Sequence, residues 1–285
     1  MTSHLTYAAR RAKSRPRAGA AILAAVALLL VSINPAQSAV AKGGRTVKPT
    51  IVLVHGAWAD ASSWERVVER LQDDGYTVRA VANPLRSLSG DAAYVRAILE
   101  TVTGPIVLVG HSYGGAVVTN AATGIPNVKA LVYVNSFALD AGETATEAAG
   151  PDSALAVPDP TTVFDLVPAT LPPTATTDLY LKESAVFTSF ATGLSADDKA
   201  VVTASQRPVT VGALNEPSGT PAWRTIPSWY LIGTEDQIIP PDAQRALAKR
   251  AGSTVTEFDA GHLGLITEPK TVTRVIEQAA AASVG

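Results

Sequence analysis

The sequence predicts an α/β domain built on a mostly parallel sheet with helices on both faces. Short apolar, β-branched runs alternate along the chain with amphipathic segments of helical period. Strands that alternate with helices in this way imply parallel pairing. The 285 residues suit one sizeable domain, and the 47% of hydrophobic residues can supply a large core.

The expected elements follow one another in a regular order. Strands are expected at 50–54, 77–81, 105–109, 128–134, 228–232 and 254–258. Helices are expected at 62–74, 91–102, 116–122, 242–250 and 270–282. Ser62 or Ser63 can cap the first helix and Gly75 can end it, while Asp91 is the N-cap candidate of the second.

The long interval from 138 to 225 interrupts this alternation and is rich in Pro, Ala and Thr. We expect it to form a lid over the carboxyl edge of the sheet. Helices are expected at 180–192 and 195–205, with Phe187 and Phe190 facing inward. The alternative is a disordered linker, restricted to 152–177.

Residues 1–41 have the layout of a secretory signal peptide, ahead of a mature domain at 42–285. An apolar run at 18–33 follows a basic region and precedes small residues, with cleavage after Ser38 or Ala41. The basic residues are Arg10, Arg11, Lys13, Arg15 and Arg17. The run is short for a membrane span, which needs about 20 residues. We therefore expect a secreted or periplasmic protein without stable membrane association after cleavage. An uncleaved anchor and twin-arginine export remain alternatives.

Charge and cysteine content narrow the possible functions. The formal net charge of −2 provides no basic excess for nucleic acid. The absence of cysteine excludes disulfides, thiolate nucleophiles and cysteine-ligated metals. We expect a small-molecule substrate, no metal and no nucleic acid partner.

The segment Gly110-His111-Ser112-Tyr113-Gly114 fits the G-x-S-x-G nucleophile elbow. It follows a buried strand and precedes a helix, the context in which the serine Oγ projects from the carboxyl edge of a sheet. Flanking glycines allow the strand and helix backbones to approach closely. Ser112 is therefore the predicted nucleophile, and an ordinary glycine-rich turn is the alternative.

A serine nucleophile needs a general base, and histidine is scarce in this chain. His4 lies in the signal segment. His111 adjoins Ser112 and is expected to point away from it, and His55 is expected to hydrogen-bond its own loop. His262 remains, in the loop after the last strand, which opens on the same sheet edge as the elbow.

Asp236 is the predicted acid of the triad, because it follows the fifth strand and reaches the same edge. Glu235 is the alternative. The backbone N–H groups of Ala57 and Tyr113 are predicted to form the oxyanion hole.

Three aromatic side chains lie in or near the loops that border the predicted site. Trp58 and Phe137 are expected to contact the substrate. Trp64 fits either the pocket wall or the core.

Four motifs together resemble the α/β-hydrolase family, in its small esterase branch with plant methyl esterases, hydroxynitrile lyases and bacterial esterases. They are His55-Gly56-Ala57-Trp58, the elbow, Gly-Thr-Glu-Asp before Ile-Ile-Pro, and Gly261-His262. The resemblance implies an α/β-hydrolase fold with a helical lid and no cofactor. The lyase members carry a lysine after the catalytic histidine and a cysteine after the serine. Here Leu263 and Tyr113 occupy those positions, which favours ester hydrolysis.

The sequence thus predicts a secreted serine hydrolase that cleaves small carboxylic esters through an acyl-enzyme. Cyanohydrin cleavage on the same scaffold and a non-catalytic, ligand-binding homologue are the alternatives.

Overall fold

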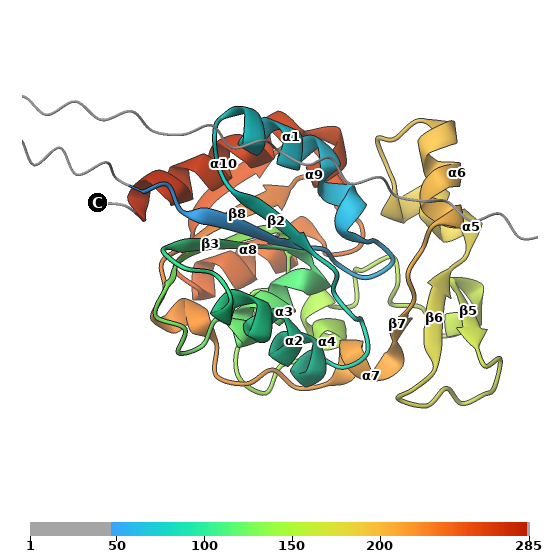
Figure 1. Ribbon diagram of the computed structural model, residues 1–285. Coiled ribbons are helices and arrows are strands. Elements are labelled where there is room, and N and C mark those ends of the chain that lie inside the picture. The colour runs from blue at the N-terminus through green and yellow to red at the C-terminus, as the bar shows by residue number, and fades with distance from the viewer. Residues whose placement is uncertain (1–46, 284–285) are drawn as a thin grey trace, which may run out of the picture. The chain divides into compact units, whose positions relative to one another are not determined.

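A six-stranded, wholly parallel sheet forms the centre of the computed structural model, which describes residues 47–283 (Figure 1). The strand order is β2-β1-β3-β4-β8-β9. The strands are β1 Thr50–Val54, β2 Val78–Val81, β3 Ile106–Ser112, β4 Val128–Ser136, β8 Ser228–Gly233 and β9 Thr254–Phe258. All residues of β3 are buried, as expected for a central strand covered on both faces. The predicted α/β class and all six strand positions are confirmed.

Helices cover both faces of this sheet. α2 and α3 pack together on one face, and α1, α9 and α10 pack together on the other (Figure 1). Their bounds, with those of α8 beside β8, are α1 Glu65–Asp73, α2 Leu88–Glu100, α3 Tyr113–Ala121, α8 Pro241–Arg250, α9 Gly264–Thr267 and α10 Pro269–Ala282. A 3-10 turn, η1 Ala61–Trp64, leads into α1.

The cap of α2 differs from the prediction. The N-cap residue is Ser87, whose Oγ accepts the N–H of Gly90 at 3.2 Å. Asp91 lies inside the first turn of the helix and is buried. The prediction of Asp91 as N-cap is wrong because the helix already begins at Leu88, and the Asp91 carboxylate accepts the hydroxyl of Tyr113 at 2.8 Å.

The segment 138–225, hereafter the cap segment, is inserted between β4 and β8 and contains a second sheet (Figure 1). Its antiparallel strands are β5 Phe164–Val167, β6 Asp178–Leu181 and β7 Val209–Thr210. Its helical elements are α4 Ala145–Ala149, η2 Pro160–Thr162, α5 Glu183–Ala185, the π-helical turn η3 Val186–Phe190, α6 Ala196–Ala204, α7 Val211–Asn215 and η4 Ala222–Arg224.

The prediction for this segment is confirmed only in part. The helix expected at 195–205 is present as α6, and Phe190 is buried as expected, while Phe187 is only partly buried. The helix expected from residue 180 is wrong at its start, because Tyr180 pairs with Asp165 in the second sheet. The helical lid implied by the resemblance is present but also contains a sheet, and the alternative of a disordered linker at 152–177 is wrong because η2 and β5 lie within that stretch.

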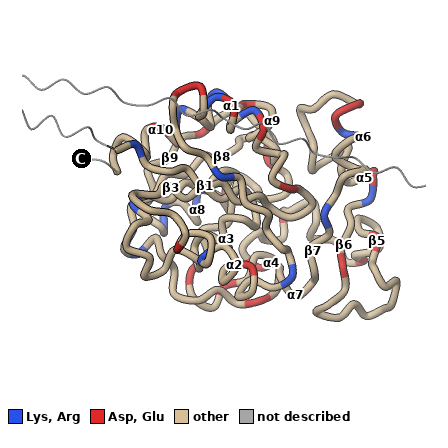
Figure 2. The backbone as a smooth tube through the Cα atoms, viewed as in Figure 1, with Lys and Arg blue, Asp and Glu red and all other residues tan. Residues whose placement is uncertain are grey.

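Lys and Arg are interspersed with Asp and Glu over the view of Figure 2. Several are paired, for example Arg86 with Asp178 at 2.6 Å and Arg245 with Glu257 at 2.7 Å. Between residues 47 and 283, no helix is long and apolar enough to cross a membrane. The signal peptide predicted at 1–41 lies outside the described residues.

Candidate active site

Ser112 ends β3 in a backbone conformation that side chains rarely adopt, with φ 52° and ψ −127°. Such a conformation costs on the order of 1–3 kcal/mol and must be held by its surroundings. The neighbouring backbones hold it closely. A Cβ on Gly114 would lie 2.4 Å from the carbonyl oxygen of Val54, and one on Gly56 would lie 2.6 Å from the Ser112 Cβ. Both glycines are therefore required by close approach, which the elbow motif predicts for Gly114.

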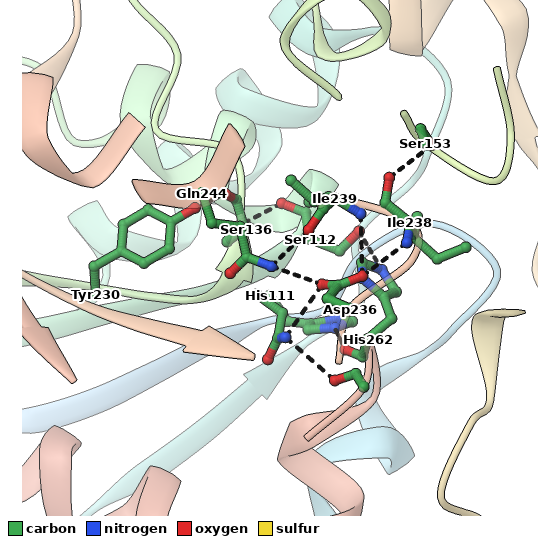
Figure 3. A network of polar contacts seen from close by, with 12 residues as sticks. His111, Ser112, Ser136, Ser153, Tyr230, Asp236, Ile238, Ile239, Gln244 and His262 are labelled. Atoms are coloured by element: carbon green, nitrogen blue, oxygen red, sulfur yellow. Dashed lines mark hydrogen bonds and ion pairs between the residues drawn. The ribbon is translucent and has the colours of Figure 1, made fainter. Parts of the chain in front are cut away.

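Ser112, His262 and Asp236 form one chain of hydrogen bonds at the carboxyl edge of the sheet (Figure 3). The Oγ of Ser112 lies 2.9 Å from Nε2 of His262. Nδ1 of His262 lies 2.9 Å from Oδ2 and 3.1 Å from Oδ1 of Asp236. All three residues are buried, so water screens these contacts little. The structure brings together the three residues predicted as a triad.

Asp236 is anchored by its own loop. The N–H groups of Ile238 and Ile239 donate to Oδ1 at 2.8 and 3.0 Å. Glu235, the alternative acid, is exposed, and its N–H donates to the carbonyl of Ala260. The geometry therefore favours Asp236 over Glu235 as the partner of His262.

Two buried amides that the sequence analysis missed complete the surroundings of Asp236. Nε2 of Gln244, in α8, donates to Oδ2 at 2.9 Å (Figure 3). Nδ2 of Asn135, near the end of β4, donates to the same oxygen at 3.1 Å. Asn135 also has a positive φ of 46°, an unusual backbone for a strand end. Hydrogen bonds to a charged carboxylate are worth about 1.5–3 kcal/mol each.

The other two described histidines are occupied with structural contacts. Nε2 of His111 donates to the carbonyl of His262 at 2.9 Å, and its ring packs edge-on to Trp64. Nδ1 of His55 donates to the carbonyl of Gly56 at 2.8 Å, while its Nε2 accepts the N–H of Asn83 at 2.9 Å.

Both of these rings are neutral at neutral pH. Burial lowers the pKa of His55 to about 4 and lowers that of His111 well below its ordinary value. Among the histidines that the structure describes, it is His262 that contacts the Ser112 hydroxyl.

The predicted oxyanion donors lie beside the serine. Ala57 and Tyr113 line the same cavity as Ser112. Tyr113 is the first residue of α3, where backbone N–H groups have no acceptor within the helix. No backbone hydrogen bond of residues 47–283 outside the regular helix and strand ladders uses either amide as its donor. Both N–H groups are therefore available to an oxygen beside Ser112.

The cavity above Ser112 has a volume of about 250 Å³. Trp58 and Phe137 line it, as predicted, and the cap segment supplies most of the remaining wall, including Phe164, Leu179 and Leu214. None of the described residues that line it is charged. Trp64 does not reach this cavity and is wholly buried in the core.

No group of three His, Cys, Asp or Glu side chains with the arrangement of a metal site occurs in the described part of the chain.

The arrangement of Ser112, His262 and Asp236 is typical of a hydrolase fold. It places a serine on a positive-φ turn between a strand and a helix, with a histidine–aspartate pair at the same edge of a parallel sheet. The chain belongs to the alpha/beta hydrolase family, whose family model matches residues 51–275. The resemblance seen in the sequence is thereby confirmed.

Relatives agree with this assignment. The chain is 26% identical to the alpha/beta hydrolase nvfD of Aspergillus novofumigatus over 270 residues, which cover 84% of this chain and 99% of that protein. It is 31% identical to a carbendazim hydrolyzing esterase of Nocardioides sp. over 106 residues, 33% of this chain and 44% of the esterase.

Two solved structures share the fold. Polyneuridine aldehyde esterase superposes with a TM-score of 0.69 at 17% identity, covering 81% of this chain and 99% of that one. An extracellular alpha/beta-hydrolase from a Paenibacillus species superposes with a TM-score of 0.68 at 22% identity, covering 81% and 98%. At these identities the likeness concerns the fold alone.

Proposed function

We propose that this protein is a serine esterase that cleaves small carboxylic esters through an acyl-enzyme. The observation that carries the proposal is the unbroken contact from Ser112 Oγ to His262 Nε2 and from His262 Nδ1 to Asp236, at 2.9 Å each. Activation of a serine requires a base within hydrogen-bond reach and a third group that orients the base.

The proposed reaction uses only groups of this site. Ser112 Oγ attacks the ester carbonyl while His262 Nε2 takes its proton, and the Ala57 and Tyr113 amides donate to the developing oxyanion. His262 then returns the proton to the alcohol oxygen as the C–O bond breaks. A water molecule, deprotonated by His262, attacks the acyl-enzyme and releases the acid and the Ser112 hydroxyl.

The cavity supports an uncharged acyl group. Its described wall carries no ionised side chain, and apolar side chains such as Phe137, Leu166 and Ile238 dominate it. A carboxylate or ammonium group on the acyl chain would lose its hydration there without a partner. The esterase activity named for the Nocardioides relative agrees with this reaction type.

A fluorophosphonate probe tests the nucleophile. It should label the wild-type protein at Ser112 and fail to label Ser112→Ala, which should also lose at least about 10³-fold in kcat for 4-nitrophenyl acetate. Ser153→Ala is the matched control, because Ser153 lines the same cavity but its Oγ donates to the carbonyl of Ile238 at 2.7 Å. Labelling of Ser112→Ala would refute the assignment.

Cyanohydrin cleavage is the competing chemistry. Leu263, which follows His262, is an apolar side chain with only 2% exposure, so it provides no ammonium group beside the base. We therefore expect no benzaldehyde from mandelonitrile above the uncatalysed rate. Enzymatic release of benzaldehyde that disappears in Ser112→Ala would replace the esterase proposal with a lyase.

Export is part of the proposal and depends on the basic, apolar and small-residue order of residues 1–41. N-terminal sequencing of protein recovered outside the cytoplasm should begin at Ala39 or Lys42. A mature protein that retains residues 1–41 in the cytoplasm would contradict export.

A further inference from the structure

A second cavity of about 220 Å³ lies beside the first, between α6 of the cap segment and η1. Its apolar wall includes Trp58, Phe190, Leu263 and Ile266. No group of the proposed reaction lies in this second cavity.

Two phenylalanines pack against Trp58 at the boundary between the two cavities. Phe164 stacks on Trp58 with ring centroids 5.8 Å apart and lines the first cavity. Phe190 packs edge-on against Trp58, also at 5.8 Å, and lines the second. Trp58 lines both. Trp58 is therefore the wall that the two cavities share, and Phe190 lies between the second cavity and His262.

The second cavity lies on the histidine side of the site. The ring of Phe190 is 5.3 Å from the ring of His262, and Leu263 continues from His262 into the wall of the second cavity. Ser112 and Tyr113 face the first cavity instead. An ester whose carbonyl is held by the oxyanion donors must present its alcohol oxygen to His262, which protonates it. The acyl part then lies in the first cavity and the alcohol part points toward Phe190.

We infer that the second cavity is a leaving-group subsite, which takes a bulky, uncharged alcohol or phenol when the Phe190 ring turns aside. This inference rests on the proposed esterase function.

Trp58 is held by a hydrogen bond, whereas the Phe190 ring is held by packing alone, against Trp58 and His262. Nε1 of Trp58 donates to the carbonyl of Leu179 at 2.9 Å. Phe190 has an apolar ring at the end of a π-helical turn, a local geometry that recurs at functional sites. The backbone beyond it is tightly packed, since a Cβ on Gly261 would lie 2.0 Å from Thr192 Oγ1. Rotation of the Phe190 side chain, rather than a backbone shift, is therefore the motion that opens the second cavity to His262.

The rim of the second cavity selects against anionic alcohols. Asp60, Glu65 and Asp198 line it together with a single cation, Arg66. A hydroxybenzoate leaving group would meet an excess of negative charge there. An uncharged naphthol would meet the apolar wall.

Two ester series separate the subsites. One keeps the acetyl group and changes phenol to 1-naphthol or to 3-hydroxybenzoate. The other keeps 4-nitrophenol and changes acetate to hexanoate. The measured quantity is kcat/KM, which covers the steps through release of the alcohol.

Phe190→Ala should raise the 1-naphthyl to phenyl acetate ratio of kcat/KM about tenfold and change the hexanoate to acetate ratio by less than about twofold. Phe164→Ala, the matched control on the other side of Trp58, should show the opposite pattern. The 3-hydroxybenzoate ester should be the poorest acetate in the wild type.

Val202→Trp provides a second, independent variant. Val202 lies on α6 and lines the second cavity, so the larger ring should fill it and lower the naphthyl to phenyl ratio. Wild-type hydrolysis with an unchanged alcohol ratio in both Phe190→Ala and Val202→Trp would overturn the subsite. Failure of the wild type to hydrolyse any ester would instead overturn the proposed function.

Discussion

Gln244 donates from a fully buried side chain to Oδ2 of Asp236, the same carboxylate oxygen that lies 2.9 Å from Nδ1 of His262. A second bond, to the carbonyl of Ile239 at 2.7 Å, fixes the orientation of the amide. Gln244 therefore connects α8 to the Asp236–His262 pair through the Asp236 carboxylate.

Gln244→Met should lower kcat about 10- to 100-fold with little change in KM, because it removes a donor to a buried carboxylate while keeping the side-chain volume. Steady-state kinetics with 4-nitrophenyl acetate measures both constants. Gln206→Met is the matched control, since Gln206 bonds the backbone of Leu181 in the cap segment. Equal losses in the two variants would contradict a positioning role for Gln244.

Gly114→Ala should destabilise the fold by about 1–3 kcal/mol or more, because the new Cβ would lie 2.4 Å from a backbone oxygen of β1 that has no room to move. Gly124→Ala, where no atom lies within 4 Å but φ is +75°, isolates the cost of backbone strain alone. Urea denaturation compares the two. A Gly114→Ala protein as stable as Gly124→Ala would show that the elbow relaxes.

Tyr113→Phe should reduce stability by about 1–3 kcal/mol, because it removes the hydroxyl that bonds the buried carboxyl of Asp91 at 2.8 Å. Burial raises the pKa of Asp91, and the hydrogen bond from Tyr113 is one of the contacts that favour its charged form. Activity should change little, because the proposed contribution of Tyr113 is its backbone amide. Tyr133→Phe, which removes another buried hydrogen bond, to Thr119, is the comparison. A large loss of kcat in a folded Tyr113→Phe enzyme would assign a role to the hydroxyl.

Acidification should destabilise the fold through His55. Its pKa is about 4 in the folded protein against about 6.5 when unfolded, so the unfolded chain binds the proton first. The stability contributed by neutral His55 is therefore complete above pH 6.5 and is lost as the pH falls toward 4. Between pH 7 and pH 5 the loss should be about 2 kcal/mol.

Urea denaturation at the two pH values measures this loss, and His55→Gln should show a smaller pH dependence than the wild type. An identical dependence in both proteins would exclude His55 as its source.

The sequence predicts the parts of the site that local pattern encodes. Ser112 follows from an elbow motif between a strand and a helix, and His262 and Asp236 follow from strand ends in a parallel sheet. Asn135 and Gln244 carry no such local signal. They reach Asp236 from positions 101 and 8 residues away, through a strand end and a helix whose relative placement only the tertiary fold defines.

The sheet of the cap segment also carries little local signal in the sequence. Its strands are two to four residues long, too short for a reliable alternating pattern. β5 pairs with β6 across a Pro-rich stretch that composition alone describes as a linker. Asp91 is a third case, because its position near the helix start resembles an N-cap, whereas its carboxylate makes a tertiary contact with Tyr113.

Because the cap segment is one continuous insertion, most of the residues that line the cavity and the Ser112–His262–Asp236 residues lie in different parts of the chain. Ser112, Asp236 and His262 all lie outside residues 138–225, whereas most of the wall of the cavity above Ser112 lies inside them. A chimaera in which this stretch is replaced should therefore change its substrate selectivity and keep Ser112, Asp236 and His262 in place. Such a chimaera must replace the contacts across the junction, which include Thr210 with the backbone of Leu85 and Arg86, Arg86 with Asp178, and Ser153 with Ile238.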